Sequence, residues 1–153
     1  MKLERLPHPS HTDGGLSRGA SGEFVLTDIK LQVRSRGSSQ IRDILLSNAV
    51  ADAMADKKKN DNYGDVKDTL DDDPRNGWTT KGADKHQAHT AVYALADPLL
   101  LGADDELLIE LRQRSTLGDA NIGRFRLCVT AEAGEAVNKV DRTPREELAA
   151  LAK

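Results

Sequence analysis

The feature that most constrains the fold is a two-residue hydrophobic alternation over residues 25–34. One set of positions is mostly apolar and the other mostly polar: Val25, Thr27, Ile29, Leu31 and Val33 alternate with Leu26, Asp28, Lys30, Gln32 and Arg34. Successive side chains of a β-strand point to opposite faces of its sheet, so this pattern predicts a strand with one buried face. The run Gly-Ser-Ser at positions 37–39 ends the pattern and predicts a turn.

Three later segments carry the same kind of signal, at residues 90–95, 106–112 and 124–130. Gly118 and Gly123 lie in the connection between the last two, which predicts that these two strands are antiparallel neighbours. Strands separated by turn-rich loops, without helices between them, are typical of a β-sandwich. The expected fold class is therefore an all-β antiparallel sandwich.

The segment 41–55 is compatible with two interpretations. Its apolar residues fall at helical spacing and it is rich in Ala, which favours a helix. The alternative is a short strand over residues 41–46 followed by a loop. The sequence leaves both open.

The expected organisation has three parts. Residues 1–22 are rich in Pro, Gly, Ser and His and are expected to form an irregular lead-in. Residues 23–135 form the sandwich module, and residues 136–153 form a linker and the start of a short C-terminal helix. The run Thr143-Pro144-Arg145-Glu146 supplies a cap, a proline at the first helical position and an acidic first turn.

Composition excludes several classes of function. The net charge of −3 and the pI near 5.8 provide no broad basic face for nucleic acid. No apolar run reaches the roughly 18 residues of a membrane span, so no membrane insertion is expected. Aromatic residues make up only 3%, which argues against a large stacking platform for sugars. Since nucleophile-elbow, P-loop and dinucleotide-binding patterns are also absent from the sequence, we expect a non-catalytic protein.

The most distinctive motif is the acidic turn at residues 70–78, Leu-Asp-Asp-Asp-Pro-Arg-Asn-Gly-Trp. It resembles the Asp-Gly-Asp-Pro-x-Thr-Gly-Trp pattern of large exported planctomycete proteins that carry cytochrome c domains. Further segments resemble the same family in the same order: Leu-Pro-His-Pro-Ser at 6–10, Gly-Glu-Phe-Val-Leu-Thr-Asp at 22–28 and Gly-Arg-Phe-Arg-Leu-Cys-Val-Thr at 123–130. The resemblance implies a module of a larger exported protein, with its export signal upstream of this sequence. The Cys-x-x-Cys-His motif of the cytochrome part is absent, so no redox role follows.

The acidic turn also resembles that of the discoidin and galactose-binding-like domains. This resemblance implies a jelly-roll sandwich that binds carbohydrate at loops on one end. It also implies that Trp78, the only tryptophan, packs in the core. Asp72 stands where the pattern has Gly, so a turn that needs a positive φ there would have to be adopted by Asp at some cost.

Asp71 and Asp73 are the candidate metal ligands. Two carboxylates spaced by one residue in a loop can offer oxygens to a structural Ca²⁺, which discoidin-like domains hold near this turn. The alternative is that both carboxylates cap turns by accepting backbone N–H bonds.

Three residues are candidates for ligand binding. His89 lies just before the predicted strand at 90–95, where the family often has a histidine. Arg124 and Arg126 fall on one face of the last predicted strand and could hold an anionic sugar by bidentate hydrogen bonds, or pair with acids across the sheet. The sequence thus predicts a carbohydrate-binding-like module. The alternative is a structural domain that packs against neighbouring domains of the parent chain and binds no sugar.

Overall fold

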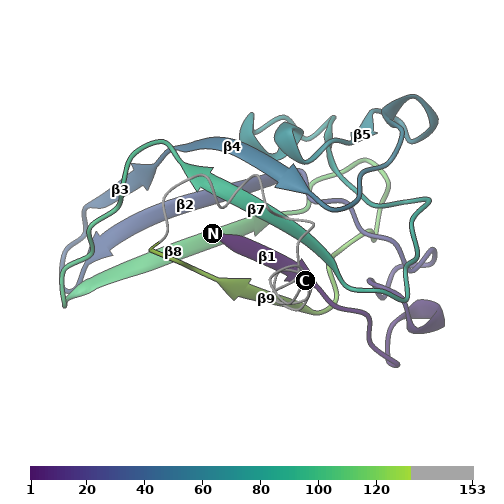
Figure 1. Cartoon of the computed structure of the whole chain (residues 1–153), viewed down its shortest axis with the longest axis horizontal. Coiled ribbons are helices and arrows are strands. Elements are labelled where there is room, and N and C mark those ends of the chain that lie inside the picture. The colour runs from purple at the N-terminus through teal and green to yellow at the C-terminus, as the bar shows by residue number, and fades with distance from the viewer. Residues whose placement is uncertain (132–153) are drawn as a thin grey trace, which may run out of the picture.

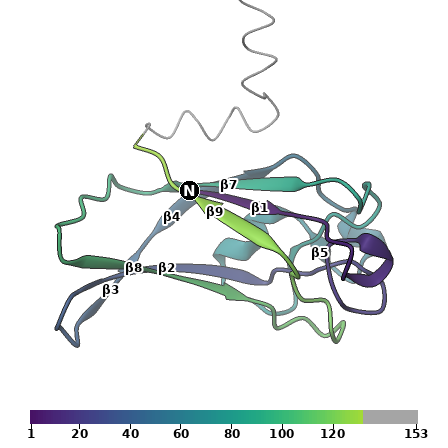
Figure 2. The same ribbon diagram turned by 90° about the horizontal axis from the view of Figure 1, so that it is seen from below.

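The computed structural model describes residues 1–131 and consists of two antiparallel sheets packed face to face (Figures 1 and 2). The four-stranded sheet has the order β4 (Leu46–Ala51), β7 (His89–Leu95), β1 (Lys2–Arg5) and β9 (Phe125–Cys128). The three-stranded sheet has the order β3 (Ile41–Ile44), β2 (Asp28–Ser35) and β8 (Asp105–Arg112). The expected all-β sandwich is confirmed.

The two ends of the sandwich differ (Figure 1). One end, the loop end, carries the short elements: η1 (Thr12–Gly14), η2 (Lys57–Lys59), η3 (Val66–Leu70) and the parallel pair β5 (Tyr63–Gly64) and β6 (Gly77–Trp78). The other, the hairpin end, carries the β2–β3 turn and the β7–β8 connection. The predicted C-terminal helix within residues 136–153 lies outside the described residues.

The expectation of an irregular lead-in over residues 1–22 is wrong at its start. Lys2–Arg5 form β1, an inner strand paired with β7 on one side and β9 on the other. A four-residue strand is too short to show a period. Its two inward residues, Leu3 and Arg5, are both fully buried, and a buried arginine breaks the hydrophobic pattern.

Two further expectations are corrected. Residues 41–55 contain no helix: β3 and β4 belong to different sheets, and Leu45 lies where the chain crosses between them. The strand alternative was right for β3 but missed β4. The last two strands are not neighbours, because β8 pairs with β2 and β9 with β1. The glycines between them therefore belong to a connection that passes from one sheet to the other.

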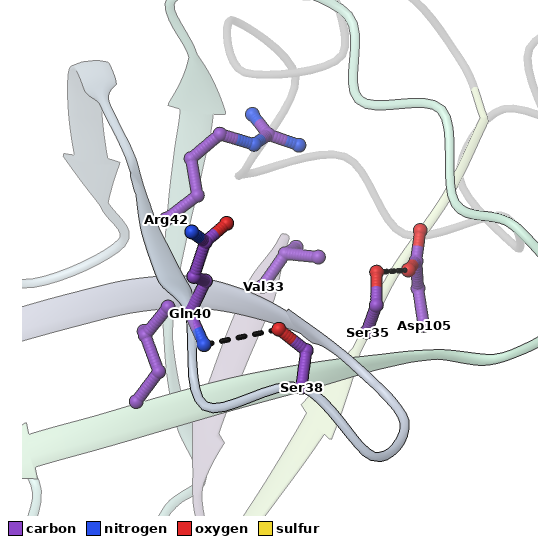
Figure 3. A pocket seen from close by; sticks show the side chains of 7 residues that line it. Val33, Ser35, Ser38, Gln40, Arg42 and Asp105 are labelled. Atoms are coloured by element: carbon purple, nitrogen blue, oxygen red, sulfur yellow. Dashed lines mark hydrogen bonds between the residues drawn. The ribbon is translucent and has the colours of Figure 1, made fainter.

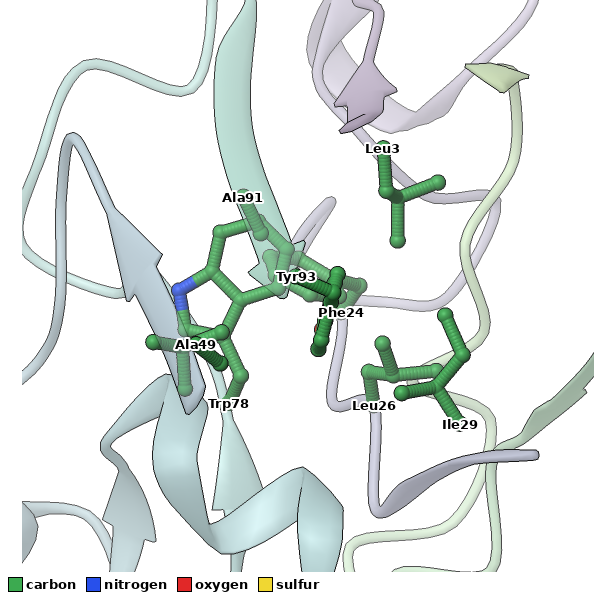
Figure 4. Close-up of a cluster of buried hydrophobic side chains, with 9 residues drawn as sticks. Leu3, Phe24, Leu26, Ile29, Ala49, Trp78, Ala91 and Tyr93 are labelled. Carbon is green, nitrogen blue, oxygen red and sulfur yellow. The ribbon is translucent and has the colours of Figure 1, made fainter. Parts of the chain in front are cut away.

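The core lies between the sheets around Trp78, which is fully buried as predicted (Figure 4). Its indole Nε1 donates to the Ala53 carbonyl oxygen at 2.9 Å, and Phe24 meets its ring edge-on with centroids 5.2 Å apart. The remaining members of the cluster are apolar side chains of both sheets and of η3: Leu3, Leu26, Ile29, Ala49, Val66, Ala91 and Tyr93. The backbone of Trp78 exchanges hydrogen bonds of 2.8 and 2.9 Å with Leu26, which ties the acidic turn to the segment leading into β2.

Candidate functional site

A buried arginine dominates the loop end. Cζ of Arg5 lies 3.5 Å from the centroid of the Phe24 ring and 4.8 Å from that of Trp78, and Nη2 donates to the Thr80 hydroxyl at 3.0 Å. Burial lowers the pKa of Arg5 to about 9, so the guanidinium is charged at neutral pH, and Asp52 contributes compensating negative charge. The ring faces stabilise this cation inside the fold.

His89 is held beside Asp52 at the same end. Its Nδ1 lies 3.3 Å from Asp52 Oδ2 and its Nε2 lies 3.0 Å from the Asp84 carbonyl oxygen. The hydrogen bond to Asp52 raises the pKa of His89. Burial opposes ionisation of Asp52, but the hydrogen bonds from His89 and the Thr90 amide outweigh it and lower the pKa of Asp52. Both ring nitrogens of His89 are thus engaged within the protein, and neither is free for a ligand.

The two arginines of the last strand are not brought together with His89. Arg126 forms an ion pair with Glu4 of the neighbouring β1, which is the cross-strand alternative considered from the sequence. Arg124 is exposed and precedes β9, where its carbonyl oxygen accepts the Leu6 amide at 2.9 Å. His89 points inward beside Arg5, whereas Arg126 lies on the outer face of the sheet.

In the acidic turn, the carboxylates of Asp71 and Asp73 act as turn caps, whereas that of Asp72 pairs with Arg112 and Arg114. Asp71 Oδ1 accepts the Asp73 amide at 3.0 Å and its Oδ2 accepts the Asn76 side-chain amide at 2.9 Å. Asp73 accepts the backbone amide and the guanidinium of Arg75 at 2.9 and 2.7 Å. Asp72 has the positive φ, 58°, that the Gly of the pattern would adopt without strain.

The two candidate Ca²⁺ ligands are both engaged within the turn. Asp73 pairs with the guanidinium of Arg75, and Asp71 accepts hydrogen bonds from the turn. Within residues 1–131 no group of three or more acidic, histidine or cysteine side chains could hold a metal ion. The Ca²⁺ site stays a prediction from the sequence, which a titration tests.

The hairpin end contains a polar hollow of about 430 Å³, here called the hairpin pocket (Figure 3). Its lining comes from β2, β3, the turn between them and the start of β8: Val33, Ser35, Ser38, Gln40, Ile41, Arg42 and Asp105. Figure 3 shows Arg42 and Gln40 on one side and Ser35 with Asp105 on the other.

Strand register and one tight turn build this pocket. Gly37 has a φ of +79° and the Ser38 amide donates to the Ser35 carbonyl oxygen at 2.9 Å, which reverses the chain. The register then places Arg42 opposite Val33, and Asp105 opposite Ser35 on the other side of β2. Side chains directly opposite one another share a face of the sheet, so Arg42 and Val33 line the same hollow.

The polar groups of the hairpin pocket differ in how far they are engaged. Asp105 Oδ1 accepts the Ser35 hydroxyl at 2.6 Å and its Oδ2 accepts the Gly102 amide at 2.9 Å. The hydrogen bond from Ser35 and that from Gly102 lower the pKa of Asp105. By contrast, the guanidinium of Arg42 makes no hydrogen bond or ion pair with residues 1–131. Asp105 is therefore ionised and attracts Arg42 through space, but the guanidinium of Arg42 has no hydrogen-bonded partner among residues 1–131.

Exposed apolar side chains surround the hairpin end. Leu100 is 90% exposed and Leu45 is 72% exposed. The Ala96 amide donates to the Leu45 carbonyl oxygen at 2.9 Å, so the connection after β7 starts beside Leu45 and reaches the pocket at Gly102. We call the exposed apolar side chains of this end the leucine rim: Ile41, Leu45, Leu100 and Leu101.

Sequence reasoning missed both the buried Arg5 and the hairpin pocket. The turn at 37–39 is the available signal, since a turn between two strands places its flanking residues together. The pattern of residues 41–46 is ambiguous, however, and the pattern of residues 106–112 does not identify the neighbour of that strand. Comparisons with protein-family models, with curated proteins and with solved structures find no match to this chain. Over residues 1–131, no helix is both long and apolar enough to cross a membrane.

Proposed function

We propose that this chain is a non-catalytic carbohydrate-binding module whose ligand binds in the hairpin pocket. The observation that carries the proposal is the combination of size and lining. A hollow of about 430 Å³ falls within the roughly 300–1,000 Å³ of small-molecule sites. Hydroxyl, amide and guanidinium groups can hydrogen-bond sugar hydroxyls, and Val33, on the same face as Arg42, adds an apolar wall.

The contacts of His89 and Ser35 support a non-catalytic role. Catalysis by a hydroxyl nucleophile needs a base within hydrogen-bond reach of that hydroxyl. Both nitrogens of His89 are engaged elsewhere, and the Ser35 hydroxyl donates to Asp105, whose lowered pKa makes it too weak a base to activate a hydroxyl. Neither residue supplies half of a nucleophile–base pair.

Recognition would rely on polar contacts rather than on stacking. Four of the five aromatic side chains, Phe24, Tyr63, Trp78 and Tyr93, are buried in the core. Because an open polar site with little apolar contact binds weakly, we expect affinities on the order of 1 mM. The resemblance to galactose-binding-like domains of exported planctomycete proteins supports a sugar ligand, binding at one end of the sandwich and export as part of a larger protein.

The leucine rim favours a second function, an interdomain contact within the parent chain. Exposed leucines grouped at one end are unusual for a surface that stays in water, and contiguous apolar patches commonly mark interaction sites. A neighbouring domain that covered Leu45 and Leu100 would bury them. In that case this module would have a structural role and the hairpin pocket would be closed by its partner.

A glycan array followed by NMR titration of ¹⁵N-labelled protein tests the first function. Binding in the hairpin pocket should shift the amide signals of residues 35–42 and 105, and Ser35→Ala with Gln40→Ala should weaken it. The matched control is Ser47→Ala, whose hydroxyl donates to a backbone carbonyl on β7 outside the pocket lining. If no glycan shifts these amides at about 10 mM, the proposal of sugar binding is wrong.

A further inference from the structure

We infer that the hairpin pocket selects saccharides that carry a carboxylate, such as uronic acids, through Arg42. This inference rests on the proposed function and names the ligand class of the same site. It starts from the charge of the pocket. Lining residues other than Arg42 and Asp105 are uncharged, and Asp105 already accepts two hydrogen bonds from Ser35 and Gly102.

Arg42 differs from the other charged side chains of these strands. On the opposite face of the sheet, Asp43 lies 3.3 Å from Lys30 Nζ, and Glu106 lies 2.6 Å from Arg34 Nη2. Asp43 of β3 and Glu106 of β8 are thus paired with basic residues of β2. Arg42 makes no ion pair with any carboxylate in the described part of the chain, although it lines the pocket and the adjoining hollow that Asp97 also lines.

An unpaired guanidinium beside hydroxyl and amide groups suits a specific ligand geometry. The planar fork of arginine binds a carboxylate through two parallel N–H···O bonds, which lysine and neutral donors cannot reproduce. A uronic acid presents one carboxylate and several hydroxyls on one ring. Its carboxylate would meet Arg42 on the β3 side, while its hydroxyls would meet Gln40, Ser38 and the Ser35–Asp105 pair.

Asp105 favours the same class over phosphate or sulfate. A dianion would lie close to the ionised Asp105, whereas a single carboxylate is matched by one guanidinium. The hydroxyls of a sugar can in turn donate hydrogen bonds to the remaining lone pairs of the Asp105 carboxylate. The pocket is therefore suited to one negative charge with hydroxyl groups around it.

The test compares oligogalacturonate with its methyl ester, which has the same rings without the charge, by NMR titration of the full chain. We expect oligogalacturonate to bind at least about tenfold more tightly, because charge-assisted bidentate pairs are stronger than neutral hydrogen bonds. Arg42→Gln should remove this preference, and Arg42→Lys should retain only part of it. Arg124→Gln is the matched control, since Arg124 is an exposed arginine outside the pocket.

The outcomes separate this inference from the proposed function. Equal binding of both oligosaccharides, or a preference that survives in Arg42→Gln, overturns the selection of acidic sugars and leaves carbohydrate binding standing. Absence of binding by either probe, and by the glycan array, overturns both. Binding of inorganic phosphate as tight as that of oligogalacturonate would show an unselective anion site and also refute the inference. Unchanged circular dichroism of Arg42→Gln, an exposed position, verifies that the variant is folded.

Discussion

Removal of the Trp78 side chain tests the packing of this fold most directly. Trp78→Ala deletes a fully buried indole that contacts Phe24 edge-on, lies beside the Arg5 guanidinium and donates to the Ala53 carbonyl oxygen. Truncating a buried tryptophan to alanine typically costs about 3–5 kcal/mol. The loss would be a large part of the roughly 5–15 kcal/mol that stabilises an ordinary domain.

The structure divides this loss into parts. Trp78→Phe keeps a ring against Phe24 and Arg5 but loses the hydrogen bond to Ala53, so it should cost about 1–3 kcal/mol for the carbonyl left without its donor. The further cost of Trp78→Ala comes from the cavity, the lost edge-to-face contact of about 0.5–1.5 kcal/mol and the exposure of one side of a buried cation.

The measurement is urea unfolding followed by far-UV circular dichroism, because both variants lack the only tryptophan fluorophore. Phe125→Ala is the control: Phe125 is also aromatic but is 47% exposed at the edge strand β9, so it should cost clearly less. If Trp78→Ala destabilises by less than about 1 kcal/mol, or no more than Phe125→Ala, the core described here is wrong.

Three other perturbations follow from the structure. The pKa of His89 is raised from 6.5 and that of Asp52 is lowered from 3.8. Their interaction should therefore make its full contribution to the free energy of unfolding between pH 3.8 and pH 6.5. Stability should fall as the pH rises through the folded pKa of His89, or as it drops through the folded pKa of Asp52. Measured by urea unfolding, the free energy of unfolding of Asp52→Asn should vary less with pH than that of the wild type. An equal variation with pH in the two proteins would contradict the pairing. Gly77→Ala should destabilise the protein by about 1–3 kcal/mol, because the φ of Gly77 is +148° and an added Cβ would lie 2.4 Å from the Leu26 carbonyl oxygen. A variant that unfolds thermally at the wild-type Tm would refute this. For Asp71 and Asp73, the turn-cap arrangement predicts a Tm that Ca²⁺ leaves unchanged, whereas a Tm rise that Asp73→Asn abolishes would establish the metal site predicted from the sequence.

The alternation of apolar and polar residues was sufficient to predict a strand and its buried face where only one face is buried. Ile29, Leu31 and Val33 of β2 are buried as their alternation predicts, and the start of β8 lies within one residue of its predicted position. The strand itself begins at Asp28 rather than at residue 25, and Leu26 and Asp28 of the opposite set are also buried. The acidic turn was likewise readable, because the resemblance to galactose-binding-like domains implies a buried Trp78 and places a Gly, which adopts a positive φ without strain, at the position of Asp72. These features depend on residues close together in the chain.

Strand partners, by contrast, were decided by the tertiary structure. Alternation shows which face of β8 is buried but not which strand lies beside it, and β8 and β9 proved to belong to different sheets. The helical spacing of residues 41–55 was overridden because β3 and β4 each extend a sheet and Ala49 fills the core between them.

In the candidate sites, too, the surroundings of the charged residues were decided by the tertiary structure and not by local sequence. Arg5 is buried because Phe24 and Trp78, distant in sequence, supply ring faces for its charge, and no local pattern encodes that environment. The hairpin pocket joins Arg42 of β3 to Asp105 of β8 across β2. The sequence alone determined an all-β chain, the faces of its longer strands and the buried tryptophan. Folding decided which charges are buried, which are paired and which guanidinium lines a pocket without a hydrogen-bonded partner among residues 1–131, because these depend on groups brought together over long separations.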